Sequence, residues 1–148
     1  IYTEQEFGDC LVELEVMVPK GSNSGIYLMG RYEIQVLDSF GRDKLGMGDM
    51  GAIYSVAVPK LNASLKAGEW QKYKIDFQAP RFDKDKKVGN AIFKEVWLNG
   101  KMIHQNAEVL KGVTGGSLSG KEAPVGPLLF QGDHGPVAFR NIRVTAKN

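Results

Sequence analysis

The sequence predicts an all-β protein, built as an antiparallel β-sandwich or jelly roll. Apolar and polar side chains alternate with a period of two in several segments, and no segment shows a convincing amphipathic helix. Turn residues separate these segments, and the 18 glycines suit a chain with many turns. About seven short strands arranged in this way favour two packed antiparallel sheets.

Length and composition fit a single domain over residues 1–148, large enough to bury a core without disulfides or metals. The chain is 43% hydrophobic and 24% charged, as in ordinary globular proteins. A net charge of +2, without basic clusters that carry interleaved aromatic residues, gives no reason to expect nucleic acid as a partner. No apolar stretch approaches the ~18 residues of a membrane span. The basic run Lys84–Lys87 is interpreted as a solvated loop.

Residues 9–19, DCLVELEVMVP, show the first strand pattern. The even-numbered positions from 10 to 18 are apolar, whereas Glu13 and Glu15 occupy odd-numbered positions. Cys10, the single cysteine, lies in the apolar row and is expected to be a small buried side chain. A single cysteine excludes an internal disulfide and a cysteine-based zinc site.

Three further segments follow the same period. Residues 25–39 are interpreted as one strand in which Gly30 makes a bulge or bend. Residues 51–59 are expected to form a third, short strand, and residues 69–80 a fourth. The apolar face of this fourth strand carries Tyr73, Ile75 and Phe77.

A β-hairpin is the firmest local prediction. Asn99-Gly100 lies between two β-rich arms and favours a two-residue type I′ turn. The resulting register pairs Glu95 with His104 and places both on the face of Trp97, so His104 is interpreted mainly as a cross-strand partner. Residues 126–146 (GPLLFQ, the turn GDHGP, then VAFRNIRVTA) are expected to form another hairpin-like pair.

A polar row marks one face of residues 25–39. Arg31, Glu33 and Gln35 share this face, and Glu15 of the preceding strand is expected to lie beside them. Such a row is either simply solvated or lines the groove of a concave sheet. A groove with polar rows and aromatic rings suits sugars, whose hydroxyls need paired donors and acceptors and whose C–H faces stack on rings.

Residues 131–136, QGDHGP, form the second candidate, because a tight turn there presents Asp133 and His134 at a sheet rim. An imidazole titrates near neutrality and can act as a base, an acid or a metal ligand. The alternative is a turn in which Asp133 only caps backbone amides, and spacing alone favours neither.

Aromatic residues in or beside the expected strands are mostly assigned to the core, but one or two are expected to stack on a sugar. The candidates for this platform are Trp70, Trp97, Tyr27 and Tyr54, and the sequence does not say which of them form it. With two histidines and one cysteine, a metal site would depend on carboxylates, amides or main-chain oxygens. The sequence therefore assigns no cofactor and leaves a divalent metal open.

Five blocks occur in order: NSGIYLMGRYEIQVLDSFG, GAIY, AGEWQKYKIDFQAPRFD, WLNGKMIHQNAEV and LLFQGDHGPVAFRNIRV. From about Phe7 onward, the chain thereby resembles the 3-keto-disaccharide hydrolase domain family, formerly catalogued as a domain of unknown function with a concanavalin A-like jelly roll. The family pattern begins earlier than this chain. The chain is therefore expected either to lack N-terminal strands or to be a short member.

The resemblance implies a carbohydrate-active hydrolase of the periplasm or cell surface that acts on glycosides oxidised at the sugar 3-position. A 3-keto group acidifies the hydrogen on C2, so a base can remove it. The glycosidic oxygen then leaves by elimination, and water can add back. This route does not need the paired carboxylates of ordinary glycosidases.

On this resemblance, Glu33 or His134 is the proton-transfer group and Arg31 stabilises the negative charge. The expected substrate-binding residues are Gln35, Asn23, Asp133, Glu15, Tyr54 and Trp70. Gln35, Asn23 and Asp133 would hold hydroxyls or a metal.

Three other functions stay open from the residues alone. A non-catalytic carbohydrate-binding module on the same sandwich would need aromatics and amides but no titrating base. A conventional retaining glycosidase would use Glu15 and Glu33. A structural or adhesion domain would leave the polar row solvated.

Overall fold

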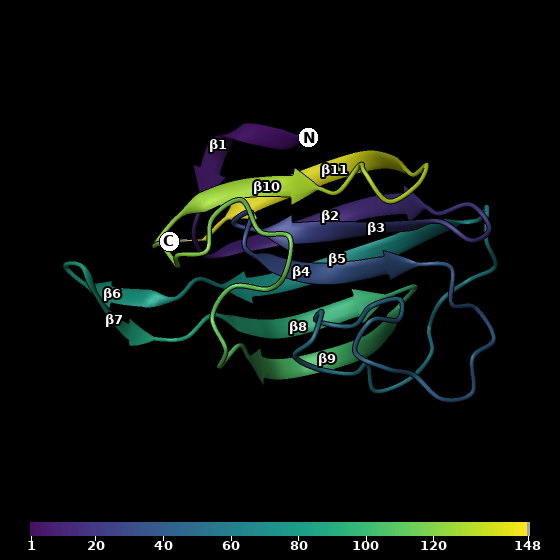
Figure 1. Cartoon of the computed structure of the whole chain (residues 1–148), viewed down its shortest axis with the longest axis horizontal. Coiled ribbons are helices and arrows are strands. Elements are labelled where there is room, and N and C mark those ends of the chain that lie inside the picture. The colour runs from purple at the N-terminus through teal and green to yellow at the C-terminus, as the bar shows by residue number, and fades with distance from the viewer. Residues whose placement is uncertain (148) are drawn as a thin grey trace.

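The computed structural model describes residues 1–147, which contain no helix and therefore none long and apolar enough to cross a membrane. Two antiparallel sheets pack face to face, which confirms the predicted all-β sandwich (Figure 1). The four-stranded sheet has the order β1 (Tyr2–Phe7), β10 (Gly126–Phe130), β3 (Asn23–Leu28) and β4 (Tyr32–Leu37). The five-stranded sheet has the order β11 (Ala138–Ala146), β2 (Cys10–Met17), β5 (Trp70–Gln78), β8 (Ile92–Leu98) and β9 (Lys101–Glu108).

The core lies between the two sheets and confirms the alternation predicted for β2 and β5. The even-numbered residues of β2 are buried, as are Tyr73, Ile75 and Phe77 of β5. The Phe77 ring centroid lies 5.5 Å from that of Tyr32 in the opposite sheet and 5.1 Å from that of Phe93 in β8. Aromatic packing therefore joins the two sheets across the core.

Residues 25–39 form a hairpin, not the single strand that was predicted. Met29 and Gly30 make the turn between β3 and β4, with φ angles of 56° and 61°. The periodicity missed this turn because the apolar pattern continues through it. The reversal matters for the site, because it places Tyr27 directly opposite Glu33 on the outer face of the sheet.

The segment 51–59 is not a strand, contrary to the prediction. Within it, Ile53 forms an isolated antiparallel bridge with Ile34 of β4, and the Tyr54 amide donates to the Glu33 carbonyl at 3.0 Å. The segment belongs to the long connection between β4 and β5. It lies along the edge of β4, and so beside the pocket described below.

The Asn99-Gly100 turn joins β8 and β9 as predicted, but the register of this hairpin differs from the prediction. A bulge shifts it by one residue, so His104 pairs with Val96 and not with Glu95. His104 is buried, whereas Glu95 lies on the outer face and accepts a hydrogen bond of 2.9 Å from the Trp97 indole. Periodicity does not reveal such a bulge, because the bulge adds a residue to one strand only.

The C-terminal strands β10 and β11 do not form a hairpin, because they belong to different sheets. β10 pairs with β1 and β3, whereas β11 pairs with β2. The chain between them crosses from one sheet to the other and carries Asp133 and His134 at the rim of the sandwich. The edge strand β1 was not predicted, because its polar sequence shows no apolar alternation.

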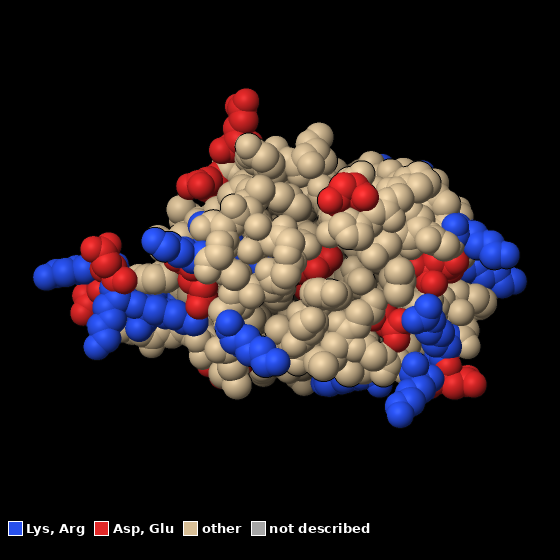
Figure 2. Space-filling model, viewed as in Figure 1, with Lys and Arg blue, Asp and Glu red and all other residues tan. Residues whose placement is uncertain are grey.

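A third, two-stranded sheet projects from the sandwich at the left of Figure 1 and consists of β6 (Arg81–Asp83) and β7 (Lys86–Gly89). Its turn and second strand contain the run Lys84–Lys87, which was predicted to be a loop. Basic and acidic side chains gather at this end of the molecule (Figure 2). Arg81 holds the base of the hairpin to the sandwich through two hydrogen bonds of 2.6 Å to Asp9.

Candidate functional site

A pocket of about 220 Å³ opens on the outer face of the four-stranded sheet. The face of the molecule drawn in Figure 2 is mostly uncharged, with a few acidic groups near its centre and basic groups toward its ends and lower edge. The pocket is lined by Asn23, Tyr27, Glu33, Gln35, Tyr54, Gly115, Gly116, Gln131 and His134. It therefore brings together Asn23, Glu33, Gln35, Tyr54 and His134, all of which were singled out from the sequence.

Glu33 is the buried carboxyl group of this pocket, with 3% of the residue exposed. Gly25 makes room for it, because a Cβ at that position would lie 2.1 Å from Glu33 Oε1. Burial raises the pKa of Glu33 to about 7, against weaker opposing effects of the Tyr27 hydroxyl and the His134 ring. A carboxyl with this pKa can accept and return a proton near neutral pH.

Two buried amide oxygens, Asn23 Oδ1 and Gln35 Oε1, have no hydrogen-bond partner among the described residues. The Gln35 Nε2 group donates to the Gly48 carbonyl at 3.0 Å, which orients the amide and leaves its oxygen unpaired. Buried acceptors without partners are costly in free energy. A ligand that carries hydroxyl donors would satisfy both.

Tyr27 lies between Glu33 and the loop that covers one side of the pocket. Its hydroxyl donates to the Gly115 carbonyl at 2.9 Å and accepts from Gln131 Nε2 at 3.3 Å. Gly116 has a φ angle of 77°, and a Cβ there would lie 2.5 Å from this hydroxyl. Burial, with the Glu33 carboxyl nearby, raises the pKa of Tyr27, so the phenol stays protonated.

Arg31 does not line the pocket, contrary to the expectation that it shares the hollow with Glu33. Its Nε donates to the Lys121 carbonyl at 2.7 Å and its Nη1 to the Met29 carbonyl at 2.9 Å. The backbone of β4 is instead tied to the covering loop by Thr114, whose Oγ1 accepts from the Glu33 amide at 3.0 Å. Arg31 therefore positions loops, because its position just after the hairpin turn directs it toward them.

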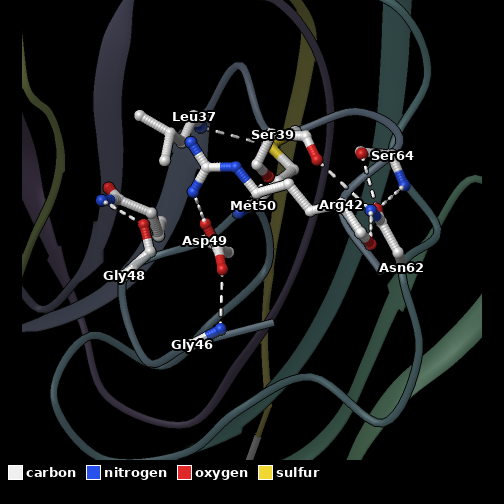
Figure 3. A network of polar contacts seen from close by, with 10 residues as sticks. Leu37, Ser39, Arg42, Gly46, Gly48, Asp49, Met50, Asn62 and Ser64 are labelled. Carbon is white, nitrogen blue, oxygen red and sulfur yellow. Dashed lines mark hydrogen bonds and ion pairs between the residues drawn. The ribbon is translucent and has the colours of Figure 1, made fainter. Parts of the chain in front are cut away.

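The connection between β4 and β5 forms the wall that carries Tyr54, and a network of polar contacts organises it (Figure 3). Asp49 accepts a hydrogen bond of 2.6 Å from the Gly46 amide and also pairs with Arg42. These contacts hold the turn that presents the Gly48 carbonyl to the site. The wall is therefore built by its own side chains and does not depend on strand pairing alone.

His104 supports the same wall from the core side. Its Nε2 lies 2.7 Å from the Gly51 carbonyl oxygen, which can only accept, so this nitrogen carries the proton. Burial lowers the pKa of His104, so the ring is neutral at neutral pH. Its position in the core removes it from the outer face on which Glu95 and Trp97 lie.

His134 reaches the pocket from the segment that follows β10. Its Nδ1 lies 2.6 Å from Asp133 Oδ1, and this hydrogen bond lowers the pKa of Asp133. A carboxylate at this nitrogen keeps Nδ1 protonated and leaves Nε2 for proton transfer. Asp133 itself lies outside the lining of this pocket and borders an adjacent recess.

Glu15 and Trp70 lie on the outer face of the five-stranded sheet, not beside Glu33 as expected. Arg140 joins them, since its guanidinium donates to Glu15 at 3.2 Å and stacks over the Trp70 ring at 3.9 Å. The expectation failed because β2 and β4 follow closely in sequence but belong to different sheets.

Several pocket residues were not predicted. Tyr27 was one of four aromatic candidates for stacking on a sugar, but it was not placed beside Glu33, although it shares the outer-face positions of its strand with Asn23. Gln131 begins the candidate segment 131–136 but was given no role there. Gly115 and Gly116 have no signal, since they lie outside the strands. Across residues 1–147, no group of three or more His, Cys, Asp or Glu side chains is arranged to hold a metal ion.

A family model for the 3-keto-alpha-glucoside-1,2-lyase-like domain matches residues 1–145. The chain belongs to this family. The resemblance read from the five sequence blocks is therefore confirmed, and the match extends to the N-terminal strand β1 of this lyase-like domain.

Solved structures of candidate glycosyl hydrolases from Parabacteroides distasonis resemble the lyase-like domain. One has a TM-score of 0.85 and 31% sequence identity, over 99% of this chain and 67% of that chain. Another has a TM-score of 0.71 and 19% identity, over 99% of this chain and 82% of that chain, and shows the fold alone. A comparison with curated proteins finds no match. At the family level, the domain is thus glycosyl hydrolase-like.

Proposed function

We propose that the domain cleaves 3-keto-glycosides by removing the proton on C2 and expelling the aglycone. The observation that carries this proposal is Glu33, a buried carboxyl with a pKa of about 7 in a pocket that also holds two unpartnered amide oxygens. Such a carboxyl suits the removal of a proton beside a ketone. The family description, which names a 3-keto-alpha-glucoside 1,2-lyase, supports the same chemistry.

Ionised Glu33 takes the proton from C2, and the electron pair of that C–H bond forms the C2–C3 double bond of an enolate. Return of charge from the enolate oxygen re-forms the ketone, moves the double bond to C1–C2 and breaks the glycosidic C1–O bond. The leaving oxygen takes a proton from the imidazolium of His134. The products are an unsaturated keto-sugar and a free alcohol, and addition of water across C1–C2 yields the 3-keto-sugar.

The remaining pocket groups would bind the sugar. Asn23 and Gln35 offer their free amide oxygens to hydroxyl donors. The Tyr27 hydroxyl proton is already donated to the Gly115 carbonyl. The second N–H of Gln131 Nε2 is therefore the lining donor suited to the enolate oxygen, a role that the resemblance implied for Arg31. Tyr54, which is 36% exposed, offers a ring face at the pocket mouth.

The test is turnover of matched native and 3-keto disaccharides, with and without a chelator. Glu33→Gln and His134→Ala should each lower kcat/KM on the oxidised substrate by at least about 100-fold, the scale of a lost acid or base. Glu13→Gln is the matched control, because Glu13 is a partly exposed carboxylate on the other sheet. Full activity in both pocket variants would show that Glu33 and His134 are not the proton-transfer groups.

A non-catalytic carbohydrate-binding module is the alternative, because the two free amide oxygens and Tyr54 would bind a sugar without any chemistry. Calorimetry with both disaccharides separates the two functions. Binding of either sugar without product from the oxidised one would favour the module.

A further inference from the structure

A second recess adjoins the pocket and has no role in the mechanism above. Its volume is about 390 Å³, and it shares Tyr27, Gly116, Gln131 and His134 with the pocket. The rest of its lining is Leu129, Phe130, Gly132, Asp133 and Ile1. Because His134 borders both spaces, a ligand that fills both passes this imidazole.

A row of paired residues explains how the polarity changes between the two spaces. Glu33 of β4 pairs with Tyr27 of β3, Tyr27 with Leu129 of β10, and Leu129 with Tyr2 of β1. Directly paired residues project from the same face of a sheet. The outer face therefore runs from a carboxyl through a phenol ring to an aliphatic side chain. Leu129 is 8% exposed and forms part of the floor of the recess.

Two polar side chains that line the recess already have partners within the protein. Asp133 Oδ1 is bonded to His134 Nδ1 at 2.6 Å, and Gln131 Nε2 donates to the Tyr27 hydroxyl at 3.3 Å. Both unpartnered amide oxygens line the first pocket instead. A leaving group rich in hydroxyls would lose hydrogen bonds to water here, whereas a flat apolar group would cover Leu129 at little cost.

We propose that this recess binds the leaving group, and that it selects flat apolar aglycones over sugars. This inference rests on the proposed function for the position of bond cleavage beside His134. The preferred substrates are then 3-keto-glucosides of aromatic or other apolar alcohols, with the oxidised sugar ring over Glu33 and the aglycone ring over Leu129.

The kinetic test compares benzyl 3-keto-glucoside with a 3-keto-disaccharide of the same anomeric configuration. The sugar alcohol is the more acidic of the two and so the better leaving group, so a preference for the benzyl substrate reports contacts of the aglycone and not leaving-group acidity. Wild-type protein should show a kcat/KM for the benzyl substrate at least about tenfold higher, the scale expected from burying one face of a ring. Equal values, or a preference for the disaccharide, would overturn the inference.

Substitutions at Leu129 test whether this residue causes the preference for the benzyl substrate. Leu129→Asn should bring the ratio of the two kcat/KM values close to one, whereas Leu129→Met should keep the preference. Ile142→Asn is the matched control, because Ile142 is an exposed apolar residue on β11 of the other sheet. A preference that survives Leu129→Asn in folded protein would show that another surface selects the aglycone.

A binding experiment tests the apolar subsite independently of the proposed reaction. Calorimetry with Glu33→Gln protein compares unoxidised benzyl and methyl glucosides in both anomeric forms. Tighter binding of benzyl glucoside, lost in a double variant with Leu129→Asn, would support the apolar subsite even if no 3-keto-glycoside is turned over. Equal binding of benzyl and methyl glucosides would refute the subsite, whatever the activity of the wild type.

Discussion

At the scale of single residues, no lysine or arginine among residues 1–147 forms an ion pair with the Glu33 carboxylate. Arg31, two positions away, donates instead to the carbonyls of Lys121 and Met29. Burial therefore dominates the environment of the carboxyl and raises its pKa to about 7. A guanidinium in the pocket would have lowered this pKa and weakened the base. The displacement of Arg31 thus favours proton transfer near neutral pH.

The dependence of rate on pH follows from this pKa. Because only ionised Glu33 can accept the C2 proton, kcat/KM should rise about tenfold per pH unit on the acid limb of the profile, below about pH 7. Steady-state kinetics on a 3-keto-glucoside between pH 5 and pH 8 would measure this limb. A flat profile in wild type would rule out Glu33 as the base.

Gly25→Ala tests how closely the sheet is fitted to Glu33. The new Cβ would lie 2.1 Å from Glu33 Oε1, so the carboxyl must move. We expect a loss of about 1–3 kcal/mol in the free energy of unfolding, as for overpacked sites, and a fall in kcat/KM of at least about tenfold.

Urea unfolding of a double variant tests whether the clash with Glu33 causes the loss of stability in Gly25→Ala. Adding Glu33→Ala to Gly25→Ala should recover most of the lost stability, because the clash disappears. Gly120→Ala is the control, since nothing lies within 4 Å of its new Cβ. Additive effects of Gly25→Ala and Glu33→Ala would contradict this account.

At the scale of elements, the connection between β4 and β5 replaces a strand at the edge of β4. It makes backbone hydrogen bonds to that strand, for example from the Gln35 amide to the Ala52 carbonyl at 2.9 Å. Its remaining order comes from polar contacts such as those of Asp49, and from His104 in the core. The wall that holds Tyr54 therefore depends on a few specific side chains.

The contact of His104 with this connection predicts a dependence of stability on pH. Since burial lowers the pKa of His104, the stabilisation is present above the ordinary value of 6.5 and is lost as pH falls below it. We expect the stability difference between wild type and His104→Gln to shrink by at most about 2 kcal/mol between pH 6.5 and pH 5. Urea unfolding of both proteins across this range is the measurement. A difference that stays constant would mean that His104 does not titrate in this way.

At the scale of the whole molecule, one face of the sandwich carries the site and the opposite face does not. The two faces are linked through the core, because the Tyr73 hydroxyl of the five-stranded sheet donates to the Gln35 carbonyl of β4 at 2.9 Å. Glu15 and Trp70 occupy the opposite outer face, where Arg140 donates a hydrogen bond to Glu15 and stacks over the Trp70 ring.

Tyr73→Phe tests the link between the sheets. The variant removes one buried hydrogen bond, but the Gln35 carbonyl keeps its bond from the Gly51 amide. The free energy of unfolding should therefore fall by only about 1 kcal/mol. Tyr2→Phe is the control, because Tyr2 is largely exposed. Equal stability of the Tyr73→Phe variant and wild type in urea would show that this bond contributes nothing.

Local patterns explain which parts of the fold were predictable. The alternation in β2 and β5 depends on neighbours in sequence, as does the turn at Asn99-Gly100, and these predictions are confirmed. The register beyond that turn depends on a bulge, which leaves no mark in the pattern of apolar residues. The hairpin turn at Met29 was hidden for a similar reason, since an apolar residue fills a turn position.

Alternation along β4 is legible in the sequence, and it placed Glu33 and Gln35 on one face. The strands and loops that surround that pair could be identified only in the folded molecule. It set Tyr27 opposite Glu33, brought His134 across from another strand, and moved Glu15 to the other sheet. The physical reason is that alternation reports the side of a strand that is buried, whereas the neighbours of a strand depend on how the two sheets close around a common core.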